Sequence, residues 1–325
     1  MINFGLSARE EAAIERVAKL DEVMIRHPAM EAALNGIQRC IAQTAHFKEP
    51  VGCMLLAEGG MGKSSVCKII QRCFPSEDIQ TTDAEITTVP VFHAEVPSTV
   101  SVSYLATNIL AGLNDASPEK GTNAAKTLRI ATLMRQCRTK IIFIDECHNL
   151  LNTTKNTAAA NKTALRWIKS IANDSKACIC LSGIPESEAI IDSDLSFQLT
   201  RRFKYRFQLQ PLLPGSKENP GELYHFLSQM CLHIRERYAL SHIPMIANYL
   251  DTFRVYAATH GNLSYVMALI KEALQQVLLK GGNSLSLEDL AAVWDTGLLR
   301  TASIAQQNPF RLGESALASE FRRLR

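Results

Sequence analysis

The chain has 325 residues, of which 46% are hydrophobic and 21% are charged, and its formal net charge is +3 at pH 7. This composition excludes a disordered protein and allows one large or two ordinary domains, each with its own core. The net charge is too small to indicate nucleic-acid binding by itself, so the distribution of charge along the chain has to supply that argument.

Nine cysteines lie mostly inside apolar runs and lack the paired spacing of metal ligands. This pattern predicts buried, reduced thiols, including Cys178 and Cys180 on one face of a strand. The N-terminus has no apolar signal segment, and no stretch has the length of a membrane span. We therefore expect a cytoplasmic protein without a membrane segment.

Two helices are predicted before the first strand. Ser7 and Glu10 form a capping-box signature, and apolar residues follow at helical spacing. Pro28 suits the first turn of the second helix.

Short apolar runs then alternate with longer amphipathic segments. The runs predict strands at residues 51–57, 89–94, 140–144, 177–182 and 205–209. The third and fourth runs are continuously apolar, which is typical of strands covered on both faces. The sequence therefore predicts an α/β fold with a parallel five-stranded sheet flanked by helices.

The composition changes after Pro211, where prolines and glycines cluster and only helical patterns follow. Ser286 and Asp289 mark the start of one later helix. We expect four segments: N-terminal helices leading into the core at 1–45, the α/β domain at 46–212, a small helical lid at 213–300 and a basic C-terminal tail at 301–325.

The segment Ala57-Glu58-Gly59-Gly60-Met61-Gly62-Lys63-Ser64 follows the first predicted strand and opens a helix, which is the context of a Walker A loop. Glycines let backbone amides face phosphates, and the helix N-terminus adds its positive dipole end. Lys63 would reach the β and γ phosphates, and Ser64 would ligate Mg²⁺. Ala57 replaces the first glycine at a position that needs only a small residue. The predicted nucleotide-binding residues are Glu58, Gly59, Gly60, Met61, Gly62, Lys63, Ser64, Ser65 and Asp145.

The third predicted strand ends in two acids, Asp145 and Glu146. Two carboxylates at the end of a buried strand cost free energy unless they serve a purpose. With Lys63 upstream they indicate a Walker B motif, in which Asp145 holds Mg²⁺ through water and Glu146 orients and deprotonates the attacking water. The predicted cofactors are ATP and Mg²⁺. Without Lys63, a strand that simply ends in solvent would be a fair interpretation.

Two weaker signals lie downstream. Ser182 ends the fourth predicted strand and could sense the γ-phosphate. Arg201 and Arg202 precede the fifth strand, where an arginine could stabilise the transition state in a neighbouring subunit. A solvated basic edge is the alternative, and the sequence does not decide which arginine would act.

Positive charge gathers around these motifs. Residues 120–140 contain six Lys or Arg, residues 147–173 contain four, and Asp145 with Glu146 provides the only acidity from 120 to 173. Such a distribution is typical of a surface that holds a phosphate backbone. The alternative is that these residues solvate the outer face of an amphipathic helix.

Several stretches resemble the TniB/TnsC family of AAA+ transposition regulators, across roughly residues 20–275. These are Arg26-His27-Pro28, Val89-Pro90-Val91 with the apolar segment at 105–113, and the run Ile144-Asp145-Glu146-Cys147-His148-Asn149-Leu150-Leu151. The last resembles the family's most specific signature, and Leu199-Thr200-Arg201-Arg202-Phe203 resembles its arginine-finger region. Ser264 departs from the sensor arginine of many relatives in the wider superfamily, which favours a slow switch over a vigorous motor.

The resemblance implies a Mg²⁺-dependent ATPase with an AAA+ nucleotide-binding domain and a helical lid. It implies self-assembly into rings or helical filaments on double-stranded DNA. Such assemblies join a TniQ-like target selector, sometimes attached to a CRISPR effector, to a TnsB-like transposase, in some systems with a TnsA-like nuclease, and hydrolysis resets them. Candidate DNA contacts in the pore are Thr99, Lys120, Thr122 and Lys126.

Three other functions remain open. A helicase loader would bind a replicative helicase and prefer single-stranded DNA. A small-molecule P-loop kinase shares Walker A but usually lacks a glutamate directly after the Walker B aspartate, and it carries an arginine-rich lid. A nucleotide-gated scaffold would show negligible turnover.

Overall fold

The computed structural model describes residues 5–80, 85–151, 158–192, 198–244 and 249–322. The chain divides into two compact units. The core unit comprises Ala29–Leu209, and the helical unit combines Met1–Pro28 with Gln210–Arg325.

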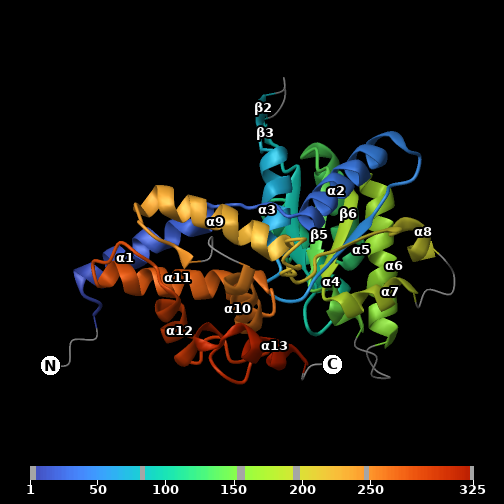
Figure 1. Ribbon diagram of the computed structural model, residues 1–325. Coiled ribbons are helices and arrows are strands. Elements are labelled where there is room, and N and C mark those ends of the chain that lie inside the picture. Colours follow the sequence, from blue (N-terminus) through green and yellow to red (C-terminus); the bar gives the residue numbers. More distant parts are fainter. Residues whose placement is uncertain (1–4, 81–84, 152–157, 193–197, 245–248, 323–325) are drawn as a thin grey trace. The chain divides into compact units, whose positions relative to one another are not determined.

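The core unit is built on a five-stranded parallel sheet in the order β4-β5-β6-β1-β7 (Figure 1). Its strands are β1 Cys53–Leu56, β4 Val91–Glu95, β5 Ile141–Asp145, β6 Cys178–Gly183 and β7 Tyr205–Gln208. Each coincides with a predicted strand, and β6 is buried along its whole length. The predicted parallel α/β sheet is confirmed.

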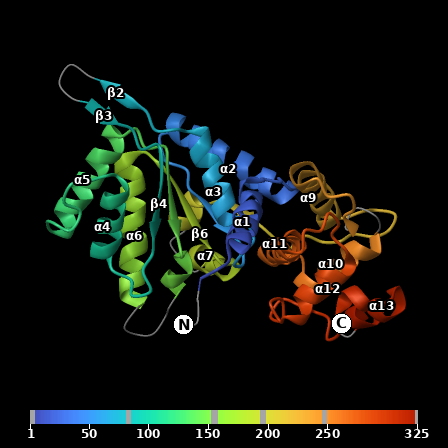
Figure 2. The same cartoon turned by 90° about the vertical axis from the view of Figure 1, so that its left-hand side faces the viewer.

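Helices cover both faces of this sheet (Figure 2). They are α2 Pro28–His46, α3 Lys63–Cys73, α4 Val102–Gly112, α5 Asn123–Gln136, α6 Ala158–Ser175, α7 Ala189–Asp192 and α8 Gln198–Arg202. On the side of α4, α5 and α6, Ile144 of β5 and Leu181 of β6 pack in an apolar cluster with Ile130. Because side chains alternate along a strand, Asp145 and Ser182 face the opposite side, where α2 and α3 lie.

Close packing on that second side explains a glycine in α2. An added Cβ at Gly36 of α2 would lie 2.1 Å from the Phe207 ring of β7, so only glycine lets the helix approach this strand. All nine cysteines are free and all but Cys73 are buried, in agreement with the predicted buried thiols.

The antiparallel pair β2 Asp78–Gln80 and β3 Glu85–Thr87 was not predicted. Figure 1 shows it beyond the end of α3. Its two isoleucines, Ile79 and Ile86, are only partly buried, because the strands pair with each other rather than with the central sheet. Three-residue strands with mostly polar side chains leave no period long enough to recognise.

The helical unit contains α1 Ala8–Ala18, α9 Glu222–Tyr238, α10 Tyr249–Thr259, α11 Leu263–Leu279, α12 Leu287–Asp295 and α13 Glu314–Arg322. Short 3-10 helices span Lys19–Glu22, Cys147–Leu151, Pro185–Glu188 and Pro309–Arg311, the second and third of them in the core unit. The predicted capping boxes at Ser7 with Glu10 and at Ser286 with Asp289 are both formed.

In the structure, the N-terminal residues pack with the C-terminal helices, whereas the sequence analysis placed them in separate segments. Val17 and Leu20 belong to one apolar cluster with Leu227 of α9 and Ile270 of α11. Residues 5–28 therefore pack in the helical unit, and the boundary between the two units falls at Pro28, inside the predicted segment 1–45. The predicted tail is folded as far as Arg322, with Leu317 buried, while 323–325 lie outside the described residues. The assignment of roles to the four segments stays a prediction.

Over the described residues, every helix is either too short or too polar to cross a membrane.

Candidate nucleotide-binding site

The loop between β1 and α3 has the backbone geometry of an anion cradle. Gly60 and Gly62 have φ values of 80° and 96°, in the left-handed region that glycine adopts most readily. Met61 between them is buried and anchors the loop, and Ala57 is fully buried at its start. Helix α3 begins at Lys63, so the amides of Lys63 and Ser64 have no intrahelical acceptor and can donate to an anion, whereas the amide of Ser65 donates to Gly62 O at 3.0 Å.

Lys63 reaches back over this loop. Its Nζ donates to the carbonyl oxygens of Ala57, at 2.5 Å, and Glu58, at 3.3 Å. The ammonium group therefore lies at the mouth of the loop, and the neighbouring Ser64 is exposed in the first turn of α3. Both side chains occupy positions from which they can contact phosphate.

The two acids lie at the carboxyl end of β5. The backbone N–H of Glu146 donates to Asp145 Oδ1 at 2.9 Å, and Glu146 has a left-handed φ of 55°. His148 Nε2 lies 3.2 Å from Glu146 Oε2. Each carboxylate thus has one oxygen in a contact with a neighbouring residue, and the two acids suit the roles of one metal ligand and one base.

Ser182 lies between the two motifs. Strand β6 pairs with β1 on one side and β5 on the other, and Ser182 is in register with Leu55 of β1. Its side chain is buried, and Oγ has no hydrogen-bond partner among the described residues. A buried hydroxyl without a partner calls for an explanation, and a phosphate oxygen at this edge would supply one.

The donor set fits magnesium bound to a nucleotide. The described residues contain no cluster of three or more His, Cys, Asp or Glu suited to a metal ion. Mg²⁺ at a phosphate site usually needs only one or two protein oxygens besides phosphate and water. The Ser64 hydroxyl, in the first turn of α3, and the Asp145 carboxylate, at the end of β5, provide such oxygens.

Two residues near Asp145, Glu95 and His93, were not singled out from the sequence. Glu95 ends β4 and pairs in register with Asp145, so its exposed side chain is at the same edge. Burial lowers the pKa of His93, against the opposing effect of the Asp145 charge. Burial also raises the pKa of Cys147 to about 12, which keeps that thiol neutral. Glu95 could have been found as the polar end of an apolar strand.

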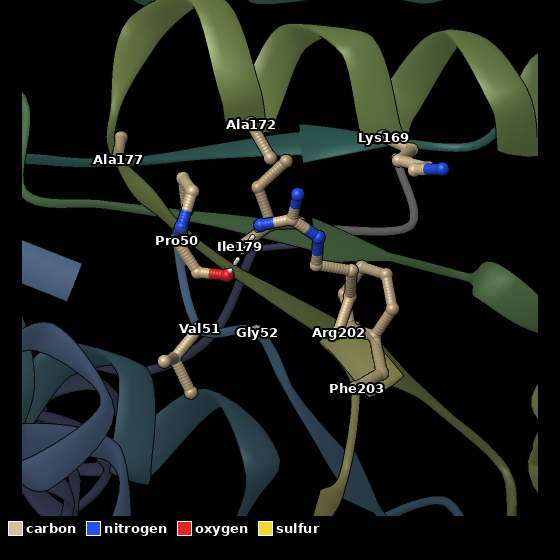
Figure 3. A pocket seen from close by; sticks show the side chains of 9 residues that line it. All are labelled: Pro50, Val51, Gly52, Lys169, Ala172, Ala177, Ile179, Arg202 and Phe203. Atoms are coloured by element: carbon tan, nitrogen blue, oxygen red, sulfur yellow. Dashed lines mark hydrogen bonds between the residues drawn. The ribbon is translucent and has the colours of Figure 1, made fainter. Parts of the chain in front are cut away.

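Arg201 and Arg202 differ sharply in their surroundings. Arg202 donates to the carbonyl oxygen of Pro50 at 3.1 Å, and its side chain is only 15% exposed. Figure 3 shows its guanidinium in a pocket with Pro50, Ala172 and Ile179. Arg201 is 73% exposed, and its closest ionic contact is Glu49 at 3.8 Å. Arg202 therefore anchors α8, whereas Arg201 can reach another molecule.

The four candidate DNA contacts differ in their exposure to solvent. Thr99, Lys120 and Thr122 are exposed, and Thr122 caps α5 by accepting from the amide of Ala125. Lys126 is only 3% exposed, and its Nζ donates to Thr107 Oγ1 of α4 at 2.7 Å. This corrects the expectation for Lys126, because the contact between α4 and α5 encloses its ammonium group.

Substitution of Lys63 tests the cradle directly. Lys63→Ala is expected to weaken ATP binding roughly ten- to hundredfold, since a charged hydrogen bond to phosphate contributes about 1.5–3 kcal/mol. Titration with a fluorescent ATP analogue measures the affinity. Lys68→Ala, an exposed lysine on the same helix, is the matched control. Equal affinities for the two variants would contradict the assignment of Lys63.

A family model for the bacterial TniB protein matches residues 16–211. This range covers more than half of the chain and contains both phosphate-site motifs, Ser182 and the two arginines. None of the curated proteins compared with the sequence matched it.

Three solved structures illustrate the likeness of this fold to known proteins. The Aeropyrum pernix ORC1 protein, in complex with DNA, has a TM-score of 0.58 at 15% identity over 86% of this chain and 68% of that one. The Aeropyrum pernix ORC2 protein, in ADPNP–ADP complexes, has a TM-score of 0.58 at 12% identity over 86% and 71%. Drosophila ORC bound to DNA has a TM-score of 0.51 at 11% identity over 90% and 67%. At these identities the likeness shows the fold alone.

Proposed function

Because the chain belongs to the bacterial TniB family, we propose that it is an AAA+ ATPase that regulates DNA transposition in the cytoplasm. The observation that carries this proposal is the arrangement of three adjacent strands, in which Lys63 follows β1, Ser182 lies near the end of β6 and Asp145 ends β5. In open α/β sheets, ligands bind at this edge. The family match connects this nucleotide chemistry with transposition.

The proposed reaction is hydrolysis of ATP to ADP and phosphate. The P-loop amides and Lys63 bind the phosphates, and Ser182 donates its free hydroxyl to the γ-phosphate. Ser64 and Asp145 would hold Mg²⁺, which when bound neutralises charge on the phosphate oxygens. Glu146 orients and deprotonates the attacking water. Without a superfamily-type sensor arginine at Ser264, we propose slow turnover that acts as a switch.

The proposed site is completed by a second subunit. Exposed Arg201 would supply positive charge to the nucleotide of a neighbouring copy, in the manner of an arginine finger. Such head-to-tail contacts generate rings when they close and helical filaments when they do not. Nucleotide binding would thereby promote assembly, and hydrolysis would promote disassembly.

We further propose that these assemblies form on double-stranded DNA and bridge a TniQ-like target selector to a TnsB-like transposase. The exposed residues Thr99, Lys120 and Thr122 support a contact with the phosphate backbone. Lys126 instead donates to Thr107 between α4 and α5. Two of the structurally similar proteins were solved with bound DNA, which agrees with this role but concerns those proteins.

Electron microscopy tests the assembly. Rings or filaments on duplex DNA are expected with a non-hydrolysable ATP analogue and not without nucleotide. Lys120→Glu is expected to weaken duplex binding severalfold and to reduce its salt dependence, since one phosphate contact is lost. Lys217→Glu, an exposed lysine of the helical unit, is the charge-matched control. Monomers under every condition would refute the proposal, and preference for single strands would favour a helicase loader.

A further inference from the structure

Glu146, the proposed base, is held at both its backbone and its side chain. Its N–H donates to Asp145 Oδ1, and its backbone is left-handed. That conformation costs a non-glycine residue roughly 1–2 kcal/mol of free energy, so it persists only where the surrounding structure imposes it. The carboxylate Oε2 lies 3.2 Å from His148 Nε2, within hydrogen-bonding distance.

His148 is presented by a firmly anchored turn, the 3-10 helix Cys147–Leu151. Cys147 is fully buried, and its Sγ would lie only 2.7 Å from a Cβ added at Gly183. Asn149 donates from its backbone to Glu146 O at 3.0 Å and from its side chain to Val96 O at 2.8 Å. The residues on both sides of His148 are thus fixed, which limits where its ring can lie.

The surroundings of the ring indicate which nitrogen carries the proton. His148 Nδ1 is buried and has no hydrogen-bond partner among the described residues. A proton on Nδ1 would be removed from water without an acceptor, which costs free energy. The arrangement favours the tautomer with its proton on Nε2, facing Glu146. One carboxylate oxygen then accepts from the imidazole, and the other is left to accept from water.

We propose that His148 is a positioning residue for Glu146, orienting the carboxylate so that its free oxygen meets the attacking water. This inference rests on the proposed ATPase function and adds a determinant of its rate. A glutamate side chain without this contact samples several rotamers, and a displacement of about 1 Å from the productive geometry can cost up to a hundredfold in rate. His148 touches neither nucleotide nor metal in this proposal, so its loss should lower kcat and leave KM unchanged.

The test compares ATP hydrolysis by His148→Leu and His148→Gln with the wild type and Glu146→Gln, all as full chains with duplex DNA. We expect His148→Leu to lower kcat about tenfold at unchanged KM. His148→Gln should recover most of the rate, because its amide places a donor near the position of Nε2. His233→Leu, an exposed histidine of the helical unit, should behave as wild type. Thermal melting and binding of a fluorescent ATP analogue verify that each variant is folded, and His148→Ala replaces His148→Leu if that variant is not.

The outcomes separate this inference from the proposed function. A wild type without turnover overturns the ATPase proposal and the role of His148 with it. An inactive Glu146→Gln beside a fully active His148→Leu overturns the role of His148 alone. Equal losses in His148→Leu and His148→Gln also overturn it, because the donor would then not be what matters.

Discussion

Glu146→Gln is expected to lower the rate of ATP hydrolysis at least a hundredfold while leaving ATP affinity nearly unchanged. The amide keeps the size and hydrogen-bonding shape of the carboxylate but cannot take a proton from water, and general-base catalysis typically contributes 10²–10⁴-fold. Glu146 has the position for this role, at the end of β5 beside Asp145. Release of inorganic phosphate under saturating ATP measures the loss.

The Glu146→Gln variant should also stay assembled on DNA for longer than the wild type, because hydrolysis is proposed to reset the assembly. Dissociation after ATP is removed provides that measurement. Glu186→Gln is the matched control, since Glu186 is an exposed acid in the turn after β6. Turnover in Glu146→Gln equal to that of the control would mean that Glu146 is not the base and would favour the scaffold interpretation.

Arg201→Ala is expected to reduce hydrolysis a hundredfold or more in assembled protein, since arginine fingers contribute up to 10³–10⁵-fold in related phosphoryl transfers. The structure favours Arg201 over Arg202 because its guanidinium is exposed, whereas that of Arg202 donates to Pro50 O. Arg202→Ala should instead lower the melting temperature, because it leaves this carbonyl without its partner.

Mixing Arg201→Ala with Glu146→Gln distinguishes a finger that acts between subunits from one that acts within its own. Each variant alone is inactive, but a subunit with intact Glu146 can receive the intact Arg201 of its neighbour. Random co-assembly in equal amounts should restore roughly a quarter of the wild-type rate, since one in four head-to-tail interfaces is complete. A mixture that stays inactive would contradict action between subunits.

Local patterns were sufficient to predict the central sheet. Continuous apolar runs identified β5 and β6 because strands buried on both faces need no polar alternation. The short strands β2 and β3 were not predicted, because their two isoleucines are only partly buried and pair outside the main sheet. The sequence also did not predict that Val17 and Ile270 lie in one apolar cluster. No local pattern encodes the packing of residues about 250 positions apart.

In the candidate site, too, some features could be predicted from local patterns and others depend on contacts between distant segments. The glycines, Lys63 and the acids after β5 could be predicted from the sequence, because a phosphate loop and a Walker B strand are each a short run of adjacent residues. Only the tertiary structure decided that Arg201 is exposed while Arg202 is an anchor, and that His148 approaches Glu146. Likewise, Lys120 and Lys126 are equivalent cations in the sequence, and only the packing of α4 on α5 encloses the second. Exposure depends on what lies across the molecule, and that information comes from contacts between distant segments rather than from neighbours along the chain.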